Sequence, residues 1–304
     1  MRDVEKPHAS EGQVLVQVWS AGLNPSDAKN ATGAMKQTTL PRTPGRDAAG
    51  IVVEGRAELK GAEVWVTGGG LGFTMDGCHA EYVLLPEAGI RRKPDSLTLE
   101  QVGSIGVPFV TAWLALVHAA AIRASETILI VGASGSVGSA ATQIAKWKGA
   151  RVIGADLRKP AKSLADESID TSAEDLRESV LRLTNGNGAD LAFDTVGGPM
   201  FEPCLKSLHR GGRLVEISSA GDRRVSFDLI DFYHQELTLH GVDSLKWDLA
   251  SAGDILDQLK PGFDSGALAP PAAQSYPLTQ AKEAYETLAA GKAVSKLIIT
   301  PQAR

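Results

Sequence analysis

One segment of the sequence combines glycine spacing with flanking elements that suit phosphate binding. Residues 128–138 read ILIVGASGSVG, with an apolar run before the glycines and helical spacing after them. A strand that enters a tight turn and then a helix brings the backbone close to a pyrophosphate, and the helix N-terminus offers it unpaired N–H groups. Ala133 stands where the first glycine of the fingerprint usually lies, and Gly135 and Gly138 fit the second and third. The pattern predicts a dinucleotide-binding loop formed by Gly132, Ala133, Ser134, Gly135, Ser136, Val137 and Gly138.

Charged residues that follow the next strand bear on the choice of dinucleotide. Asp156 ends that strand about twenty residues beyond the loop, where a carboxylate accepts hydrogen bonds from ribose hydroxyls and favours NADH. Arg158 and Lys159 follow, and either could bind a 2′-phosphate and so favour NADPH. Both could equally be solvated loop charges.

The elements around this loop indicate an α/β domain. Apolar runs at 127–131, 151–155, 189–193, 213–217 and 237–242 predict strands, and helical stretches such as 139–148 separate them. Strands that alternate with helices form a parallel sheet with right-handed crossovers. We therefore predict a Rossmann domain over residues 111–261.

The remainder of the chain predicts a β-rich domain. Short strands are expected at 13–21, 48–54, 63–67 and 81–85, and a closing helix and strand at 279–290 and 296–299. Prolines at 261, 270, 271 and 277 predict a linker before that closing segment. The second domain is thus assigned to residues 1–110 and 262–304.

Composition limits the cellular compartment and the classes of binding partner that are expected. The 304 residues carry a formal net charge of −5, which argues against nucleic-acid or anionic-membrane binding. Two cysteines cannot form a disulfide framework, so a cytoplasmic protein is expected. Residues 102–122 carry no formal charge, but proline and glycine interrupt them, and a buried helix pair explains them better than a membrane span.

Several motifs in order along the chain resemble those of a known family. The sequence is similar to the zinc-independent quinone oxidoreductase branch of the medium-chain dehydrogenases/reductases. The resemblance covers nearly the whole chain. It rests on the segments 126–152, GQVLVQVWSAGLNPSD (12–27), PGRDAAGIVV (44–53), GCHAEYVLLP (77–86), VPFVTAWLAL (107–116), FDTVGG (193–198), GGRLVEI (211–217) and 291–301.

The resemblance implies an architecture and an activity. It implies a GroES-like catalytic domain beside the Rossmann domain and NAD(P)H-dependent reduction of a quinone or an activated alkene. It also implies a preference for NADPH, with NADH possible, and a homodimer that pairs through the strand near 237–242. Thr111 resembles a position near the nicotinamide, and Val196, Ser218 and Ser219 are also assigned to cofactor binding.

The same resemblance predicts a site without a metal. Asn24 and Arg46 stand where zinc-dependent relatives carry a cysteine and a histidine, and the adjacent pair Cys78 and His79 is a poor zinc site. Without a Lewis acid, hydride transfer to an electron-poor acceptor is favoured over alcohol oxidation. Asn24 is the first candidate for a substrate contact, with a turn residue before Pro25 as the alternative. Tyr82 is a second candidate for orienting a carbonyl, with a core role as its alternative.

Other functions remain open or fail on the sequence. A short-chain dehydrogenase needs a lysine four residues after its catalytic tyrosine, and neither Tyr233 nor Tyr285 has one. An alcohol or carbonyl dehydrogenase of the same superfamily remains an alternative, as does a non-catalytic NADPH-binding relative. At the N-terminus, only about a dozen residues precede Gly12, so we expect the edge hairpin usual in the family to be missing.

Overall fold

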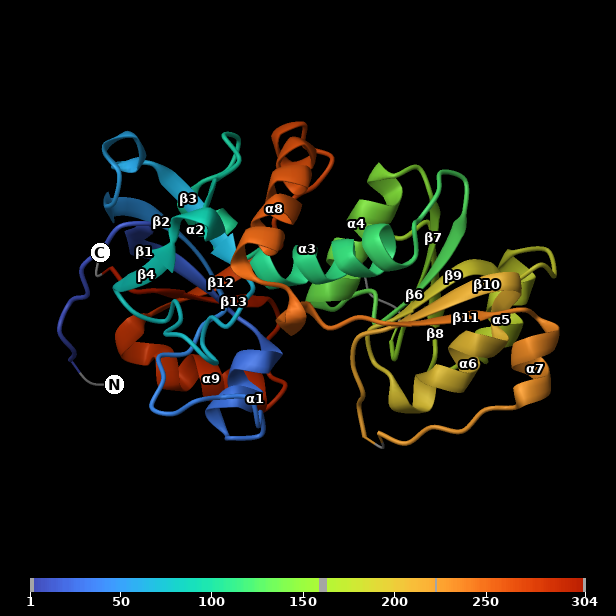
Figure 1. Cartoon of the computed structure of the whole chain (residues 1–304). Helices are drawn as coiled ribbons and strands as arrows, with labels where there is room; N and C mark the ends of the chain where they lie inside the picture. The colour runs from blue at the N-terminus through green and yellow to red at the C-terminus, as the bar shows by residue number, and fades with distance from the viewer. Residues whose placement is uncertain (1–2, 159–162, 222, 303–304) are drawn as a thin grey trace. The chain divides into compact units, whose positions relative to one another are not determined.

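The chain forms two compact units, which are drawn in Figure 1. This computed structural model describes residues 3–158, 163–221 and 223–302. The first unit comprises residues 1–110 and 244–304, and the second comprises residues 111–243. The division at 110/111 coincides with the one expected from the sequence. The return to the first unit comes at Ser244, so the expected boundary at 262 was wrong.

The second unit is built on a parallel sheet with the strand order β11-β10-β9-β6-β7-β8. Numbered from β6, this is the order 3-2-1-4-5-6 of dinucleotide-binding folds. Its elements are α3 (Gly106–Trp113, shared with the first unit), η3 (Leu114–Ala119), β6 (Thr127–Val131), α4 (Ser136–Trp147), β7 (Arg151–Asp156), β8 (Glu167–Asp170), α5 (Leu176–Leu183), β9 (Ala189–Asp194), η4 (Gly198–Met200), α6 (Phe201–Lys206), β10 (Leu208–Glu216), α7 (Leu229–His234) and β11 (Thr238–Gly241).

Successive side chains along each strand of this sheet point to opposite faces, and helices cover both faces. Every apolar residue from Ile128 to Val131 is buried, as expected of a central strand covered on two sides. Helices α5 and α6 cover one face, where their apolar residues join Leu129 and Val131 in one core cluster. Helix α4 and the segment η3 lie over the other face. The switch in crossover direction falls between β6 and β9, where folds of this class bind ligands.

The first unit is β-rich, as expected. Its sheet runs in the order β12-β13-β1-β2-β3-β5, and β4 also pairs with β1. Its elements are β1 (Gln13–Leu23), α1 (Pro25–Ala31), β2 (Asp47–Glu54), η1 (Ala57–Leu59), β3 (Glu63–Thr67), β4 (Tyr82–Pro86), η2 (Glu87–Gly89), β5 (Arg91–Arg92), α2 (Leu99–Val102), η5 (Ser244–Lys246), α8 (Leu249–Asp264), β12 (Ala273–Pro277), η6 (Leu278–Gln280), α9 (Ala281–Ala289) and β13 (Lys296–Thr300).

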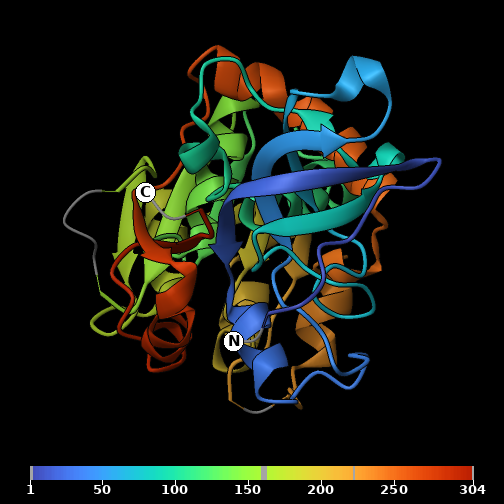
Figure 2. The same ribbon diagram turned by 90° about the vertical axis from the view of Figure 1, so that its left-hand side faces the viewer.

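Segments from the two ends of the chain meet in this sheet. Strand β13 pairs antiparallel with β1, and Leu23 lies opposite Leu297. Figure 2 gives a second view of this unit. Leu23, Leu297 and Ile299 then share a small core with α9, to which Ala284 and Tyr285 contribute. The closing segment therefore lies beside the start of α1, immediately after β1.

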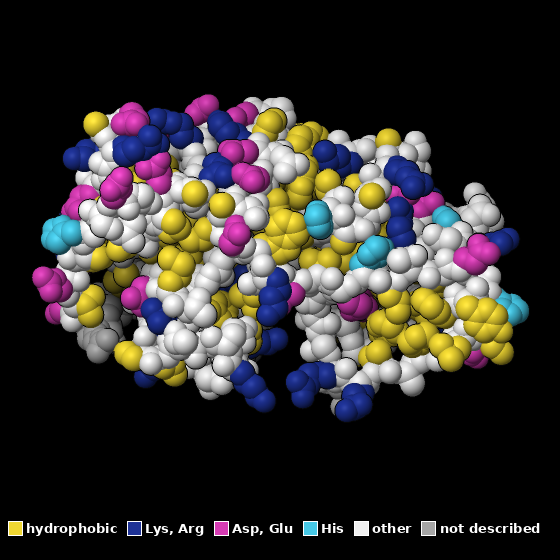
Figure 3. All heavy atoms as spheres, viewed as in Figure 1, with side chains coloured by type: hydrophobic (Ala, Val, Ile, Leu, Met, Phe, Trp, Pro, Cys, Tyr) yellow, Lys and Arg dark blue, Asp and Glu magenta, His cyan; other side chains and the backbone are white. Residues whose placement is uncertain are grey.

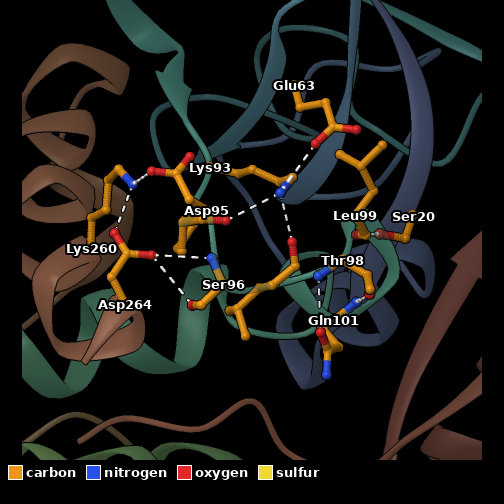
Figure 4. A network of polar contacts seen from close by, with 12 residues as sticks. Ser20, Glu63, Lys93, Asp95, Ser96, Thr98, Leu99, Gln101, Lys260 and Asp264 are labelled. Carbon is orange, nitrogen blue, oxygen red and sulfur yellow. Dashed lines mark hydrogen bonds and ion pairs between the residues drawn. The ribbon is translucent and has the colours of Figure 1, made fainter. Parts of the chain in front are cut away.

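Helix α8 explains why the second domain boundary was wrong. Phe263 lies within 6.1 Å of Trp65 and 4.9 Å of Phe109, measured between ring centroids, and all three belong to the first unit. Figure 4 shows the polar side of the same contact, where Lys260 bonds Asp95 at 3.0 Å and Asp264 accepts from Ser96 at 3.3 Å. This packing outweighs the helix-breaking tendency of Pro261, which lies inside α8.

The expected linker after Pro261 is confined to residues 265–272, which contain Pro270 and Pro271 and form neither helix nor strand. Helix α8 continues to Asp264, and Ala273–Pro277 forms the edge strand β12, which pairs with β13. Proline is tolerated at such an edge because no neighbouring strand needs its N–H group.

The N-terminal segment forms no hairpin over residues 3–10, the part of it that the structure describes. Instead, Ala9 donates its backbone N–H to Glu54 at 3.0 Å, and the Lys6 ammonium lies 4.2 Å from the centre of the Tyr82 ring. The segment 102–122 contains α3 and η3, and within the described residues no helix is long and apolar enough to cross a membrane.

Candidate functional site

The glycine loop of the second unit has the geometry that close approach of a pyrophosphate requires. Gly132 follows β6 with φ of +76°, and Gly135 precedes the first turn of α4 in an extended conformation. A Cβ atom at Gly138 would lie 2.1 Å from the carbonyl oxygen of Gly132, so only glycine fits there. Ser136 and Val137 open α4, whose N-terminal N–H groups and dipole favour an anion. The loop therefore fits a dinucleotide phosphate.

Asp156 lies against this loop. Its carboxylate accepts the backbone N–H of Ser134 at 3.1 and 3.2 Å and the Ser134 hydroxyl at 2.7 Å. The acid that sequence reasoning assigned to the ribose thus also fixes the phosphate loop. Arg158 is exposed just beyond it, whereas Lys159 lies outside the described residues.

Two further segments lie beside the loop. The turn after β9 is close to Gly132, because a Cβ at that glycine would lie 2.4 Å from the Thr195 hydroxyl oxygen. Ala220 donates its N–H to the Val196 carbonyl at 2.8 Å, which ties the segment that contains Ser218 and Ser219 to the same turn. The structure therefore brings Val196 and the two serines together at the switch point. Thr111 is buried within α3.

In the first unit, Asn24 is the centre of a buried polar cluster. Its Oδ1 accepts from Lys296 Nζ at 2.5 Å, and its Nδ2 donates to Asp47 at 2.7 Å and to Asp27 at 3.2 Å. The Asn24 backbone N–H also donates to Asp27 at 2.8 Å. Both amide hydrogens are thus taken, so in this arrangement Asn24 has none to give to a substrate carbonyl.

Charge explains how this cluster tolerates burial. Desolvation raises the pKa of Asp27 and of Asp47 and lowers that of Lys296, and in each case the opposite charges work against the shift. Asp47 is held further by the backbone N–H of Val107 at 2.9 Å. Buried charges are costly unless opposite charges and hydrogen bonds compensate them. Here each charged group has opposite charges nearby and accepts or donates hydrogen bonds, and Asp27 Oδ1 alone among the carboxylate oxygens of this cluster has no hydrogen-bond partner in the described part of the chain.

Arg46 extends the cluster where zinc-dependent relatives were expected to carry a histidine. The residue is 3% exposed, and its guanidinium lies 5.7 Å from the Phe73 ring centre and donates to the hydroxyls of Ser26 and Ser244 at 3.2 and 3.4 Å. A fixed cation at this position repels a metal ion.

Two further candidate ligands in this unit are buried: His79, which is engaged in hydrogen bonds, and the Cys78 thiol. The two ring nitrogens of His79 bond the Tyr285 hydroxyl at 2.7 Å and the Gly22 carbonyl at 3.1 Å. Because the carbonyl only accepts, Nε2 carries the proton and Nδ1 accepts from the tyrosine. Burial lowers the pKa of His79 to about 4 and raises that of the Cys78 thiol. His79 is therefore not a free ligand, and the described residues contain no group of three His, Cys, Asp or Glu suited to a metal ion.

Tyr82 is not brought to this cluster. It lies opposite Gln17 on β1, whereas Asn24 follows the far end of that strand, about 20 Å away at the usual rise per residue. The Lys6 ammonium covers its ring.

Sequence reasoning missed four members of the polar cluster in the first unit: Asp27, Asp47, Tyr285 and Lys296. Two signals were available. Asp27 follows Asn24 at the spacing of a capping box, and Lys296 is a lone cation in an apolar closing strand. That Lys296 and Asn24 meet could not be read from the sequence, since 272 residues separate them.

Comparison with known proteins agrees with this architecture. Residues 10–95 match the family model of the alcohol dehydrogenase GroES-like domain, and residues 136–254 match that of the zinc-binding dehydrogenases. The predicted fold class, a Rossmann domain with a GroES-like β-rich domain, is confirmed.

Individual relatives cover most of the chain. A zinc-type alcohol dehydrogenase-like protein of Schizosaccharomyces pombe is 36% identical over 270 residues, covering 88% of this chain and 80% of its own. A quinone oxidoreductase of Lama guanicoe is 31% identical over 311 residues, covering 96% and 91%. The crystal structure of an alcohol dehydrogenase superfamily protein from Novosphingobium aromaticivorans superposes with a TM-score of 0.87 at 29% identity, covering 99% and 95%. The chain belongs to the medium-chain dehydrogenase/reductase superfamily, in its quinone oxidoreductase branch.

Proposed function

We propose that this protein is an NAD(P)H-dependent oxidoreductase that transfers a hydride to a quinone or an activated alkene without a zinc ion. The observation that carries the proposal is the glycine loop between β6 and α4, at the switch point of a sheet with dinucleotide-binding strand order. A relative named quinone oxidoreductase, 31% identical, supports the choice of acceptor.

The chain's own residues bind and orient, while the bound nicotinamide supplies the hydride. The backbone from Gly132 to Gly138 and the first turn of α4 would hold the pyrophosphate. Asp156 fixes the loop through Ser134. In the first unit, the charged cluster around Asn24 keeps the residues at the start of α1 in one arrangement.

A panel of acceptors tests the proposal. Oxidation of NADPH and NADH is followed at 340 nm with 1,4-benzoquinone, 1,2-naphthoquinone, an aliphatic enone and a saturated aldehyde, and the reverse reaction with primary and secondary alcohols. Turnover with the quinones or the enone supports the proposal. Turnover with alcohol and aldehyde alone contradicts it, and would favour the activity named in the Schizosaccharomyces pombe relative. Tight cofactor binding without any turnover would identify a non-catalytic binding protein.

Metal analysis gives a first prediction. Because Arg46 and Asn24 stand at the expected ligand positions and both ring nitrogens of His79 are engaged, purified protein should contain far less than one zinc per chain. Reductase activity should survive incubation with EDTA and 1,10-phenanthroline. Stoichiometric zinc, together with loss of activity on its removal and recovery on its return, would overturn the mechanism.

Cofactor preference gives a second prediction. We expect a higher kcat/KM with NADPH than with NADH, and we expect Arg158→Ala to weaken NADPH selectively by about 1–3 kcal/mol, the value of a lost charged hydrogen bond. Lys159→Ala is a parallel variant. Because Asp156 bonds Ser134, Asp156→Ala should raise KM for both cofactors rather than for NADH alone. Unchanged NADPH kinetics in both basic variants, with wild type preferring NADH, would assign the choice to Asp156.

Association gives a third prediction. Strand β11 lies at the edge of its sheet, and exposed apolar side chains of α7 (Leu229, Ile230 and Tyr233) gather near it, in the yellow area over α6 and α7 in Figure 3. We propose a homodimer that pairs these edges. Light scattering should give twice the chain mass for wild type. Leu239→Lys in β11 should shift the mass toward the monomer, while Val294→Lys in the first unit, at an exposed apolar residue outside the proposed interface, should not. A wild-type monomer at high concentration would refute the proposal.

A further inference from the structure

Two carboxyl groups lie side by side at the carboxyl ends of neighbouring strands in the second unit. Asp194 ends β9 and Glu216 ends β10, and the two residues are register partners in the parallel pairing. Asp194 is fully buried. Its Oδ2 and the Oε1 of Glu216 are both buried without a hydrogen-bond partner among the described residues. Two acceptor atoms left unpaired in this way are costly unless a proton lies between them.

The other oxygen of Asp194 holds part of the cofactor site. Its Oδ1 accepts the backbone N–H groups of Val196 and Gly197, both at 2.8 Å. Gly197 has φ of +70°, and a Cβ there would lie 2.2 Å from the Ser218 carbonyl oxygen, so this turn touches the segment that follows β10. The turn and the segment are the two that flank the phosphate loop at the switch point. Asp194 and Glu216 therefore lie directly beneath both.

The surroundings of the pair favour one shared proton. The titratable groups that act on it are its own two members and the Cys204 thiol of α6. The register partners on the flanking strands, Val131 on β6 and Gly241 on β11, carry no charge, and His240 pairs with Val215, whose side chain points to the opposite face from that of Glu216. Burial and the neighbouring Asp194 raise the pKa of Glu216 to about 8.

We propose that Glu216 is a positioning residue for the cofactor, whose neutral carboxyl donates a hydrogen bond to the Asp194 carboxylate and so keeps the Val196–Gly197 turn and the Ser218–Ala220 segment in the arrangement that binds NAD(P)H. The inference rests on the proposed function, since it concerns the same binding site. When Glu216 loses its proton, two buried carboxylates face each other and repel, and the turn that Asp194 holds must move.

The expected consequence is a pH-dependent affinity. If only the protonated pair is competent to bind, the apparent dissociation constant is the intrinsic one divided by the protonated fraction. It should then be flat from pH 6.5 to 7.5 and rise by about tenfold at pH 9, and tenfold again per further pH unit. Glu216→Gln carries a permanent N–H donor of similar size, so its dissociation constant should stay flat.

The experiment is a fluorescence titration of NADPH and of NADH into wild type, Glu216→Gln and Glu167→Gln from pH 6 to 10. Glu167→Gln removes a carboxylate from β8 of the same sheet and should follow wild type. Dividing the wild-type constant by the Glu216→Gln constant at each pH cancels titration of the cofactor's own phosphate. A ratio that rises through pH 8 supports the proposal, and a ratio that is constant over the whole range overturns it.

Thermal unfolding tests the shared proton without any cofactor. Because the folded pKa of Glu216 lies above its ordinary value of 4.5, its contribution to stability is complete below pH 4.5 and is lost as the pH rises to about 8. The Tm of Glu216→Gln minus that of wild type should therefore increase between pH 5 and 8 and level off above. A Tm difference that is independent of pH refutes the shared proton.

Failure of wild type and all variants to bind NADPH or NADH at pH 6.5, with the Tm pattern intact, would instead refute the proposed function. If Glu216→Gln does not fold, the wild-type affinity profile decides alone.

Discussion

Replacing Gly138 with alanine is expected to abolish tight cofactor binding. The added Cβ would lie 2.1 Å from the Gly132 carbonyl oxygen and 2.8 Å from the Ala133 Cα, and both are backbone atoms that cannot rotate aside. The start of α4 must therefore move away from β6, and the N–H groups that hold the pyrophosphate move with it. We expect the dissociation constant for NADPH to rise by about 100-fold, which corresponds to about 3 kcal/mol. Isothermal titration of NADPH into purified protein measures it.

A matched glycine separates this local effect from general damage. Gly241 lies in the same sheet, has no positive φ and has open space where its Cβ would be, so Gly241→Ala should bind NADPH as wild type does. Thermal unfolding of both variants shows how much stability each substitution costs. A Gly138→Ala protein that is folded and binds NADPH within about threefold of wild type would show that the loop is not the phosphate site.

The two candidate sites differ in how far the sequence alone could predict them. The strand, glycine turn and helix of the proposed phosphate loop were predictable because they are consecutive, and each has a local signature in residues 127–147. The same holds for β3, whose bounds Glu63–Thr67 were predicted correctly. Edge strands were harder. The short strand β8 was not predicted, because its four residues, ESID, show neither an apolar run nor a clear alternation.

The charged cluster of the first unit could not be predicted for a different reason. Asn24 was singled out by its resemblance to a family position, but its partners come from β2 and β13, and only the assembled sheet brings them within bonding distance. Likewise, α8 was separated from the first unit because prolines near its end suggested a linker. Its packing on Trp65 and Phe109 is a tertiary effect that no local pattern shows.

Replacing Lys296 with methionine should be among the most destabilising single changes in the first unit. The ammonium is buried, donates to Asn24 and to the Leu23 carbonyl, and offsets the charges of Asp27 and Asp47. Methionine fills a similar volume but leaves the carboxylates short of one positive charge and the Asn24 Oδ1 short of a donor. Removing a charge that compensates buried charges of the opposite sign costs about 3–5 kcal/mol. Urea unfolding at pH 7, followed by tryptophan fluorescence, measures the loss.

Two companion variants test whether charge is the cause. Lys282→Met in α9 removes an exposed lysine, whose side chain is 88% exposed, so its unfolding free energy should stay within about 0.5 kcal/mol of wild type. Lys296→Met combined with Asp47→Asn removes one charge of each sign, and the double variant should be less destabilised than the sum of the two single variants. The Asp47→Asn change is not free, because Asp47 accepts from both Asn24 and Val107, and the asparagine keeps only one acceptor oxygen. Strict additivity of the two unfolding free energies would show that Lys296 acts by packing alone. A Lys296→Met protein as stable as wild type would show that the buried cluster does not hold the start of α1 in place.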